Sequence, residues 1–292
     1  MKTNVSSSRK PLLRAFYGFV IAGAALWVLS RDACAQLYVT NMPHGGGVVS
    51  EYNAETGELI KAELITGLTL PYGLAVRGNS LFVVDEAGSV GKYNATTGAA
   101  INRSFITKGL GNPYTPALLG ERLYVSNLGD GNGGMVLVYN AKTGAVINLN
   151  FITTLDVPGG LVLSGDKLFV SDLGLSNVGE YNADTGDAIN ANLITGLAAP
   201  AGLAITGNTL YVADNNGYVG EYNAVTGVAI KAKFITKLHN PNGLALLGDR
   251  LFVTNYGSGT VGEYDATTGA TINAHFITGL KKPLGIAIKN PK

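Results

Sequence analysis

A seven-residue segment with the consensus Glu-Tyr-Asn-Ala-x-Thr-Gly recurs six times along the chain, with substitutions at single positions. Its tyrosine stands at positions 52, 93, 139, 181, 222 and 264, so the spacing between copies stays between 41 and 46 residues. A fixed period of this length is typical of proteins built from one structural unit that is repeated and stacked. This repeat limits the possible folds more than any other feature of the sequence.

Each repeat predicts four short β-strands. A Leu-Tyr-Val or Leu-Phe-Val strand starts near positions 37, 81, 123, 168, 210 and 251 and stops at an Asn or Asp. A Gly-rich turn leads to a Val-Gly-Glu-Tyr strand. The Asn-Ala-x-Thr-Gly segment then predicts a tight hairpin, because Asn caps its own turn and Gly accepts a positive φ. An alternating Ile-x-x-x-Phe/Leu-Ile-Thr strand and a continuously apolar Pro-x-Gly-Leu-Ala-Ile strand complete the repeat.

Four strands per repeat and the lack of any helical periodicity predict an all-β fold, a six-bladed β-propeller with one four-stranded blade per repeat. The phase of the repeats also predicts how the ring closes. The chain after residue 35 begins with a Leu-Tyr-Val strand and ends with the apolar strand of Pro283 to Ile288, which the first blade otherwise lacks. We therefore expect the last strand of the chain to complete the first blade and to cover its free edge.

The first 35 residues predict a secretory signal peptide. Basic residues at positions 2, 9, 10 and 14 precede an uncharged apolar run of 14 residues, Phe16 to Leu29. This run is shorter than the roughly 20 residues of a membrane span, and the small residues around Cys34 fit a cleavage site after Ala35. An uncleaved N-terminal anchor, lipidation of Cys34 and a weak twin-arginine signal stay open as alternatives. We therefore expect residues 36–292 to remain after cleavage as one domain without a membrane span, either secreted or periplasmic.

Composition excludes several classes of function. The 292 residues include 21 basic and 20 acidic side chains, which leaves no excess of positive charge for binding nucleic acid. The first 35 residues contain five of the basic residues and one of the acidic residues, so the mature domain has a net charge of −3. One Cys and three His residues cannot build a disulfide framework or a Cys-rich zinc module. The 40 Gly and 10 Pro residues are fewer than a disordered low-complexity chain contains.

The loops at the two ends of the predicted blades differ in variability. The Asn-Ala-x-Thr-Gly turns are nearly identical in every repeat. The loop after the Leu-Tyr-Val or Leu-Phe-Val strand and the link to the next blade instead differ from repeat to repeat. Because loops on a rigid scaffold often carry binding residues, we expect any ligand to meet this variable face. The candidate binding residues that belong to it, apart from a ring of Asn and Asp residues, are His44, Tyr72, Glu86, Tyr114, Asp130, His239, Asn242 and Tyr256.

The ring consists of the residue that ends the Leu-Tyr-Val or Leu-Phe-Val strand, the second strand of each blade. These residues are Asn41, Asp85, Asn127, Asp172, Asp214 and Asn255. Six such side chains around a channel mouth offer oxygen ligands for Ca²⁺, Mg²⁺ or a polyhydroxylated ligand. The regular recurrence favours a simpler interpretation, in which each side chain caps its own turn. The segment from Asp130 to Gly134 resembles half of a calcium loop but lacks its closing acidic residue, so we expect a turn there. No other cofactor is predicted.

Three segments of the repeat, Pro-x-Gly-Leu-Ala-Ile, Leu-Tyr-Val-Ala-Asp and Val-Gly-Glu-Tyr, are clearest between Pro200 and Tyr222. They resemble NHL-repeat propellers and the broader group of streptogramin lyases and SMP-30/gluconolactonase-type hydrolases. The resemblance covers about 256 residues, the whole mature chain, and implies a propeller without selecting a function. Streptogramin lyases have seven blades, Trp-Phe-rich strands and a His/Glu catalytic set, none of which this sequence matches. No catalytic residue is therefore carried over.

Two functions are compatible with these patterns. The first is an exported monomer that acts as a binding or scaffold module, whose variable face meets a protein, a glycan or a small molecule. The alternative is a metal-dependent lyase or lactonase, in which His44 or His239 would pair with Glu86, the only nearby carboxylate on this face. The sequence favours the binding module, because it contains no nucleophile, base or metal triad with a recognisable spacing.

Overall fold

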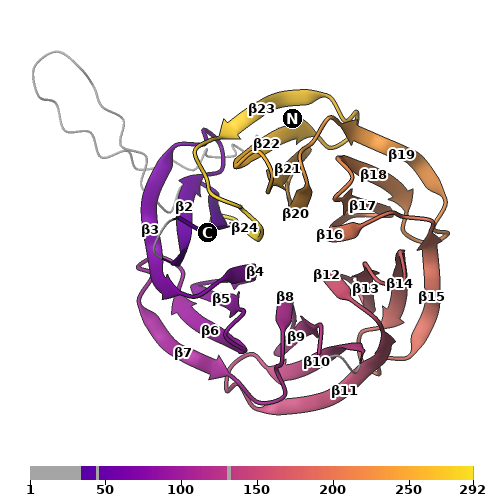
Figure 1. Ribbon diagram of the computed structural model, residues 1–292, viewed down its shortest axis with the longest axis horizontal. Helices are drawn as coiled ribbons and strands as arrows, with labels where there is room; N and C mark the ends of the chain where they lie inside the picture. The colour runs from indigo at the N-terminus through magenta and orange to yellow at the C-terminus, as the bar shows by residue number, and fades with distance from the viewer. Residues whose placement is uncertain (1–33, 44–45, 130–132, 292) are drawn as a thin grey trace, which may run out of the picture.

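The computed structural model describes residues 34–43, 46–129 and 133–291. Its 24 strands form six four-stranded antiparallel sheets, which are arranged as the blades of one ring (Figure 1). The all-β, six-bladed propeller predicted from the repeat is confirmed. The blades are numbered one to six along the chain, starting with the blade that contains β1.

The strands occupy four concentric positions in the ring (Figure 1). The innermost strands are β24 (Ile286–Lys289), β4 (Pro71–Arg77), β8 (Pro113–Leu119), β12 (Pro158–Ser164), β16 (Pro200–Thr206) and β20 (Pro241–Leu247). The second strands are β1 (Gln36–Asn41), β5 (Ser80–Asp85), β9 (Arg122–Asn127), β13 (Lys167–Asp172), β17 (Thr209–Asp214) and β21 (Arg250–Asn255). The third strands are β2 (Gly47–Asn53), β6 (Ser89–Asn94), β10 (Gly134–Asn140), β14 (Asn177–Asn182), β18 (Tyr218–Asn223) and β22 (Thr260–Asp265). The outermost strands are β3 (Leu59–Leu68), β7 (Ala100–Ile106), β11 (Val146–Leu155), β15 (Ala188–Thr195), β19 (Ala229–Thr236) and β23 (Thr271–Ile277).

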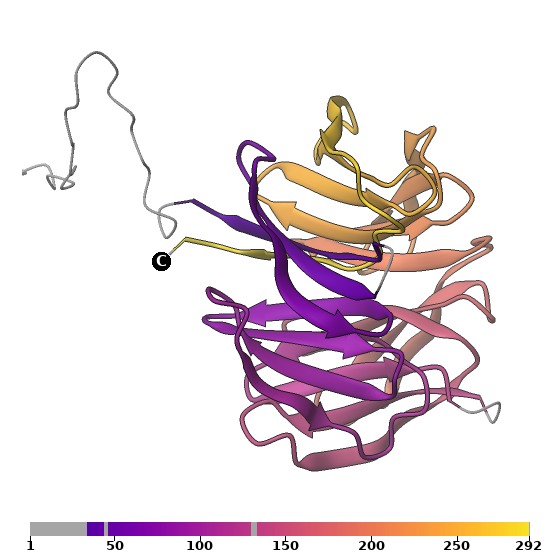
Figure 2. The same cartoon turned by 60° about the vertical axis from the view of Figure 1, so that its left-hand side comes forward.

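Blade one contains strands from both ends of the chain. β24 pairs antiparallel with β1, and the paired Cα atoms run from Gln36 with Lys289 to Val39 with Ile286. The C-terminal strand therefore supplies the innermost strand of blade one, as the phase of the repeats predicts. Figure 2 shows that β1 begins and β24 ends side by side, at the end of the ring where the hairpin turns also lie. Residues 36 and 289 thus lie on this turn face, opposite the variable face.

The Asn-Ala-x-Thr-Gly turns are built as the sequence predicts. In the first of them, the Asn53 side chain accepts hydrogen bonds from the backbone N–H groups of Glu55 (2.7 Å) and Thr56 (3.2 Å). Gly57 follows with a φ of 74°, and a Cβ added there would stand 2.4 Å from the carbonyl oxygen of Phe276 in the neighbouring blade. Glycine is thus required at this position both for its left-handed backbone and for the close approach of the next blade.

Hydrophobic side chains are buried between the blades. Each of the six core clusters combines residues of two adjacent blades. Between blades one and two, for example, Tyr38 and Val49 pack with Leu81 and Tyr93. A single four-stranded sheet has no partner of its own for its apolar faces, so each blade depends on both of its neighbours.

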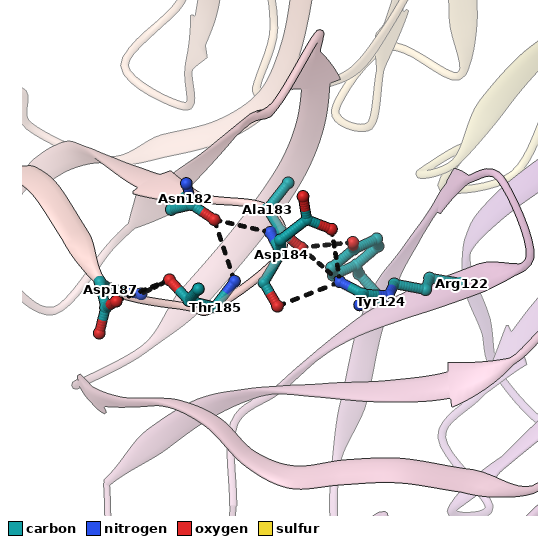
Figure 3. A network of polar contacts seen from close by, with 7 residues as sticks. All are labelled: Arg122, Tyr124, Asn182, Ala183, Asp184, Thr185 and Asp187. Carbon is teal, nitrogen blue, oxygen red and sulfur yellow. Dashed lines mark hydrogen bonds and ion pairs between the residues drawn. The ribbon is translucent and has the colours of Figure 1, made fainter.

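Tyrosine and phenylalanine alternate at one buried position of the second strands, which is occupied in turn by Tyr38, Phe82, Tyr124, Phe169, Tyr211 and Phe252. Each of the three tyrosine hydroxyls donates a hydrogen bond to the carbonyl oxygen of an alanine in the turn of the next blade. Figure 3 shows the contact between blades three and four. There Tyr124 donates to the Ala183 carbonyl oxygen at 2.6 Å, and Arg122 donates to the same oxygen and to Asp184. These bonds attach the turn of one blade to the side of the preceding blade.

A second set of interblade hydrogen bonds lies closer to the axis of the ring. In blade four, Ser171 Oγ accepts a hydrogen bond from the N–H of Gly160 (2.8 Å) and donates to the carbonyl oxygen of Ala201 on the next innermost strand (2.5 Å). Ser126 in blade three and Thr254 in blade six make the same two contacts. One hydroxyl therefore joins the innermost strands of two successive blades.

Two blades on opposite sides of the ring lack this hydroxyl, because blade two has Val84 and blade five has Ala213 at the same position. The innermost strands are nevertheless close together beside Ala213. A Cβ added to Gly202 would stand 2.1 Å from the carbonyl oxygen of Asn242 on the next innermost strand. A serine at position 213 would therefore have the Gly202 N–H and the Asn242 carbonyl oxygen as partners.

We expect Ala213→Ser to stabilise the ring by about 0.5–1.5 kcal/mol, the net contribution of a typical hydrogen bond. Ser171→Ala is the matched opposite change, and we expect it to destabilise the ring by about 1–3 kcal/mol, because it leaves buried polar groups of the backbone without their partner. Denaturant titration of both variants and the parent protein measures the free energies of unfolding. An unchanged free energy of unfolding in Ser171→Ala would show that these hydroxyl bonds do not stabilise the ring.

Candidate functional site: the channel mouth on the variable face

On the variable face, the end of each second strand is fastened to the link that enters the same blade. In blade four, the carboxylate of Asp172 accepts hydrogen bonds from the backbone N–H groups of Asp156 (2.8 Å) and Val157 (2.9 Å) in the link. It also accepts one from Leu175 (3.1 Å) in the following loop. Asp172 is completely buried. This side chain therefore holds the link and the loop together.

The same contact recurs around the ring. The side-chain oxygens of Asp85, Asn127 and Asp214 each accept two hydrogen bonds from backbone N–H groups of the link, and Asn41 accepts one from Lys281. In five of the six blades, the oxygens of the predicted Asn and Asp ring thus bind the backbone. Their main partner is the preceding link, which the sequence interpretation of each residue as a cap for its own turn did not include.

Metal binding by this ring stays a prediction. Between residues 34 and 291, leaving out the two short undescribed segments, no three His, Cys, Asp or Glu side chains are grouped so that they could hold a metal ion. The oxygens that would face a cation are the ones that accept the backbone hydrogen bonds of the links.

Blade six departs from the common pattern. Asn255 is 3% exposed, and its Oδ1 has no hydrogen-bond partner among the described residues. The link that enters this blade contains Lys237 and Asn240, with φ angles of 64° and 51°. In the described part of the chain, the other non-glycine residues with positive φ are Ser176 and Lys282, which also lie on the variable face. Left-handed backbone is uncommon at residues other than glycine and clusters at functional sites. Its occurrence here therefore favours the variable face as the functional face.

Each innermost strand presents one variable residue to the mouth of the central channel. It is the middle residue of the Pro-x-Gly segment or its equivalent, namely Tyr72, Tyr114, Gly159, Ala201, Asn242 and Leu284. The four larger side chains of this set line a central cavity of about 100 Å³. The residue that follows is Gly in five blades and packs against the next innermost strand, so the middle position decides what the channel mouth presents to a ligand.

A hydrogen bond crosses the channel. Asn242 Nδ2 donates to the hydroxyl oxygen of Tyr114 at 3.0 Å. The two residues belong to β20 and β8, which lie on opposite sides of the ring (Figure 1). The ring of Tyr72 packs against that of Tyr114, with centroids 4.8 Å apart and an interplanar angle of 35°. Two aromatic rings and one amide therefore close the channel mouth.

Burial, the largest cause, together with the nearby side chains of Glu86, Tyr114 and Tyr256 raises the pKa of Tyr72 to about 12. Burial also raises the pKa of Tyr114, while the hydrogen bond from Asn242 acts in the opposite direction. Both phenols are therefore neutral at physiological pH, and they act through stacking and hydrogen bonds rather than as bases. The same interactions indicate that Glu86 and Tyr256 lie near Tyr72.

Two further pockets flank the channel mouth. One, of about 100 Å³, is mainly apolar, and its lining includes Tyr114, Leu128, Val157, Leu173 and Ala201. The other, of about 540 Å³, is basic and aromatic, and its lining includes Met42, Tyr256, Lys281 and Lys282. Tyr114 also lines the central cavity, and Tyr256 lies beside Tyr72. The central cavity and the apolar pocket therefore adjoin at Tyr114, and the basic pocket lies on the same face of the ring.

The structure brings together five of the eight candidate binding residues that lie outside the Asn and Asp ring. Tyr72, Tyr114 and Asn242 close the channel, and Glu86 and Tyr256 lie near Tyr72. The His239 side chain is exposed, and its carbonyl oxygen accepts a hydrogen bond from the N–H of Gly257. His44 and Asp130 lie outside the described residues, so the pairing of His44 with Glu86 and the turn at Asp130 stay predictions.

Sequence reasoning missed the exposed leucines and lysines at the two flanking pockets. Leu173 and Leu175 are 40% and 50% exposed, although both are large and apolar. Lys281 and Lys282 are also exposed and stand where the link into blade five has two alanines. All four residues stand at positions that vary between the blades, which is the signal that identified Tyr72 and Asn242. The sequence interpretation applied that signal only to aromatic, amide, carboxylate and histidine side chains.

The chain was compared with known proteins. Residues 45–274 match the model of the PQQ_2 family, which is described as "Outer membrane protein assembly factor BamB". No curated protein matches the sequence. The NHL, streptogramin lyase and SMP-30 likeness gains no support from this family match.

Solved structures share the fold. A chain in the crystal structure of a nidogen/laminin complex superposes with a TM-score of 0.72 at 17% identity, over 87% of this chain and 98% of that chain. The computationally designed Ika8 protein gives a TM-score of 0.52 at 14% identity, over 85% of this chain and 74% of that chain. At these identities, the matches show the propeller fold alone.

We expect Asp172→Ala to lower the free energy of unfolding by at least about 1–3 kcal/mol, because three backbone N–H groups lose their acceptor. Asp172→Asn is the matched control and should retain most of the stability, since Asn occupies this position in three blades. Thermal unfolding with and without Ca²⁺ or Mg²⁺ checks both variants. If the ring only fastens the links, these cations leave the melting temperature of the parent unchanged. A rise in melting temperature that Asp172→Asn abolishes would instead establish a metal site.

Proposed function

The chain belongs to the PQQ_2 family, described as outer membrane protein assembly factor BamB, and on this premise we propose that it is an exported propeller that binds a protein partner through its variable face. Fold alone does not select a function for a propeller, so the proposal rests on the site. The observation that carries it is the channel mouth, where Tyr72, Tyr114 and Asn242 form a stacked and hydrogen-bonded group.

The chemistry of this group suits a protein interface. Tyrosine gives a large, rigid contact area at little cost in conformational entropy, and tyrosines are enriched among the residues that dominate binding energy. Tyr114 is held in place by the hydrogen bond from Asn242 and by the ring of Tyr72, so little freedom remains to be lost when a partner binds. The group also lies at the centre of the face, where such residues are most effective.

The two faces of the ring support the same assignment. On the turn face, each repeat keeps its Asn-Ala-x-Thr-Gly segment, and the Asn or Asp side chain binds its own turn. On the variable face, loops and channel residues differ from blade to blade. The Asp and Asn side chains at the ends of the second strands meanwhile hold the links by hydrogen bonds. Rigid support beneath variable side chains is the usual construction of a recognition surface.

The proposed location follows from the predicted signal peptide and from the family description, which names the outer membrane. We propose export to the cell envelope, in the periplasm or beyond it. A search of the described residues finds no helix with the length and apolar character of a membrane span.

A library of random peptides displayed on phage and selected on the mature chain tests the proposal. We expect ligands whose affinity falls at least about tenfold in Tyr114→Ala, a loss typical of a central interface residue. Val225→Lys is the control, because Val225 is 56% exposed in a turn on the opposite face. The melting temperature of each variant confirms that it folds. Ligands that lose affinity in Val225→Lys and not in Tyr114→Ala would refute the proposal.

A further inference from the structure

The variable face has two chemically different halves, one on each side of the channel mouth. The apolar half is defined here by Leu128, Val157, Leu173 and Leu175, from blades three and four. The basic half is defined by Tyr256, Lys281 and Lys282, from blade six and the link into blade one. Tyr72 and Tyr114 lie between the two halves.

The exposed leucines of the apolar half do not follow from the repeat. Most of the other exposed large aliphatic side chains do, because one isoleucine recurs in every outermost strand, at Ile60, Ile101, Ile147, Ile189, Ile230 and Ile272. At the position of Leu173 only blade three also has a leucine, Leu128, and Leu173 and Leu175 are 40% and 50% exposed. Leu173 also lines the apolar pocket of about 100 Å³. Exposed leucines next to an apolar pocket are typical of a surface that a partner covers.

The basic half carries local positive charge on a domain whose predicted net charge is −3. Lys281 and Lys282 are both exposed and line the pocket of about 540 Å³. Lys282 Nζ lies 5.8 Å from the centroid of the Tyr256 ring. Neither lysine makes an ion pair with any other described residue. Their charges are therefore available to an acidic ligand.

An acidic side chain at the apolar half strengthens the contrast in charge. The carboxylate of Asp156 lies at the apolar half, where a Cβ added to Gly174 would stand 2.1 Å from it. Glu86 lies near Tyr72, between the two halves, where it helps to raise the pKa of the Tyr72 phenol. An acidic group of a partner is thus attracted by the two lysines, whereas Asp156 disfavours its binding at the apolar half.

We propose that the partner presents an extended segment with acidic residues at one end and large apolar residues at the other, lying across the channel mouth. The acidic end pairs with Lys281 and Lys282, and the apolar end covers Leu173 and enters the adjoining pocket. Tyr72 and Tyr114 contact the middle of the segment. This inference rests on the proposed protein-binding function and adds to it the chemistry and the direction of the bound segment.

Synthetic peptides with a fluorescent label provide the test, with dissociation constants measured by fluorescence anisotropy on the full mature chain. The reference peptide has two Glu residues, a Gly-Ser spacer and two Leu residues. A second peptide replaces both Glu by Gln, a third replaces them by Lys, and a fourth replaces both Leu by Ser. We expect the reference peptide to bind most tightly and the Lys peptide most weakly. Its advantage over the Gln peptide should fall as the salt concentration rises.

Three variants separate the contributions of the two halves. We expect Lys281→Gln with Lys282→Gln to weaken the reference peptide about tenfold and to leave the Gln peptide unchanged. Leu173→Ser with Leu175→Ser should weaken the reference peptide and leave the Ser peptide unchanged. Glu86→Gln should strengthen binding of the reference peptide several-fold, because it removes a negative charge beside Tyr72, over which the acidic segment passes. A gain of affinity of this kind cannot result from partial unfolding.

Equal affinities of the Glu, Gln and Lys peptides, or an unchanged affinity in the double lysine variant, would overturn the inference. The phage selection distinguishes this failure from failure of the proposed function. Ligands that depend on Tyr114 but share no acidic-to-apolar pattern would overturn only the inference about the segment. Selected ligands that do not depend on Tyr114 would remove the proposed function as well.

Discussion

The fold depends on the burial of apolar surface between neighbouring blades. No blade buries its apolar faces by itself, because every core cluster draws on two adjacent sheets. Such an arrangement is satisfied only when the ring is closed, since an open ring would leave two faces exposed to water. The pairing of β24 with β1 therefore does more than cover an edge. It brings blade one against blade six, where Leu37 and Ile286 join a cluster with Phe252 and Phe276.

Close contact between the blades also decides where the sequence is free to vary. Gly57 and Gly202 lie where an added Cβ would meet the backbone of a neighbouring blade, so these positions accept little else. The middle residue of the Pro-x-Gly segment carries no such restriction, since it ranges from Gly159 to Tyr114 at equivalent positions. The loops of the variable face can also vary in sequence, because the Asn and Asp side chains that end the second strands hold the backbone of the links. Recognition chemistry can therefore change there without loss of the ring.

Blade six shows how this freedom is used. Its link has left-handed backbone at Lys237 and Asn240, and the Asn255 side chain no longer receives the hydrogen bonds that its counterparts accept. The same blade supplies Asn242 to the channel mouth and Tyr256 to the basic half. Strained backbone and recognition residues thus occur together, as they do where structure serves binding rather than stability.

The sequence by itself determined the number of blades, the four strands in each and the closing role of the last strand. The number of blades and the closing role follow from a repeat period of about 42 residues along the chain. The strands follow from local patterns and turn chemistry such as that of Asn53 and Gly57. It also identified Tyr72, Tyr114 and Asn242 as departures from the repeat. Only the tertiary structure decided that Tyr114 and Asn242, 128 residues apart, are hydrogen-bonded across the channel. It also decided that Asp172 binds the link 15 and 16 residues before it, and that exposed leucines and lysines lie on opposite sides of the mouth. Such contacts depend on which blades ring closure places opposite one another, and no local pattern in the sequence contains that information.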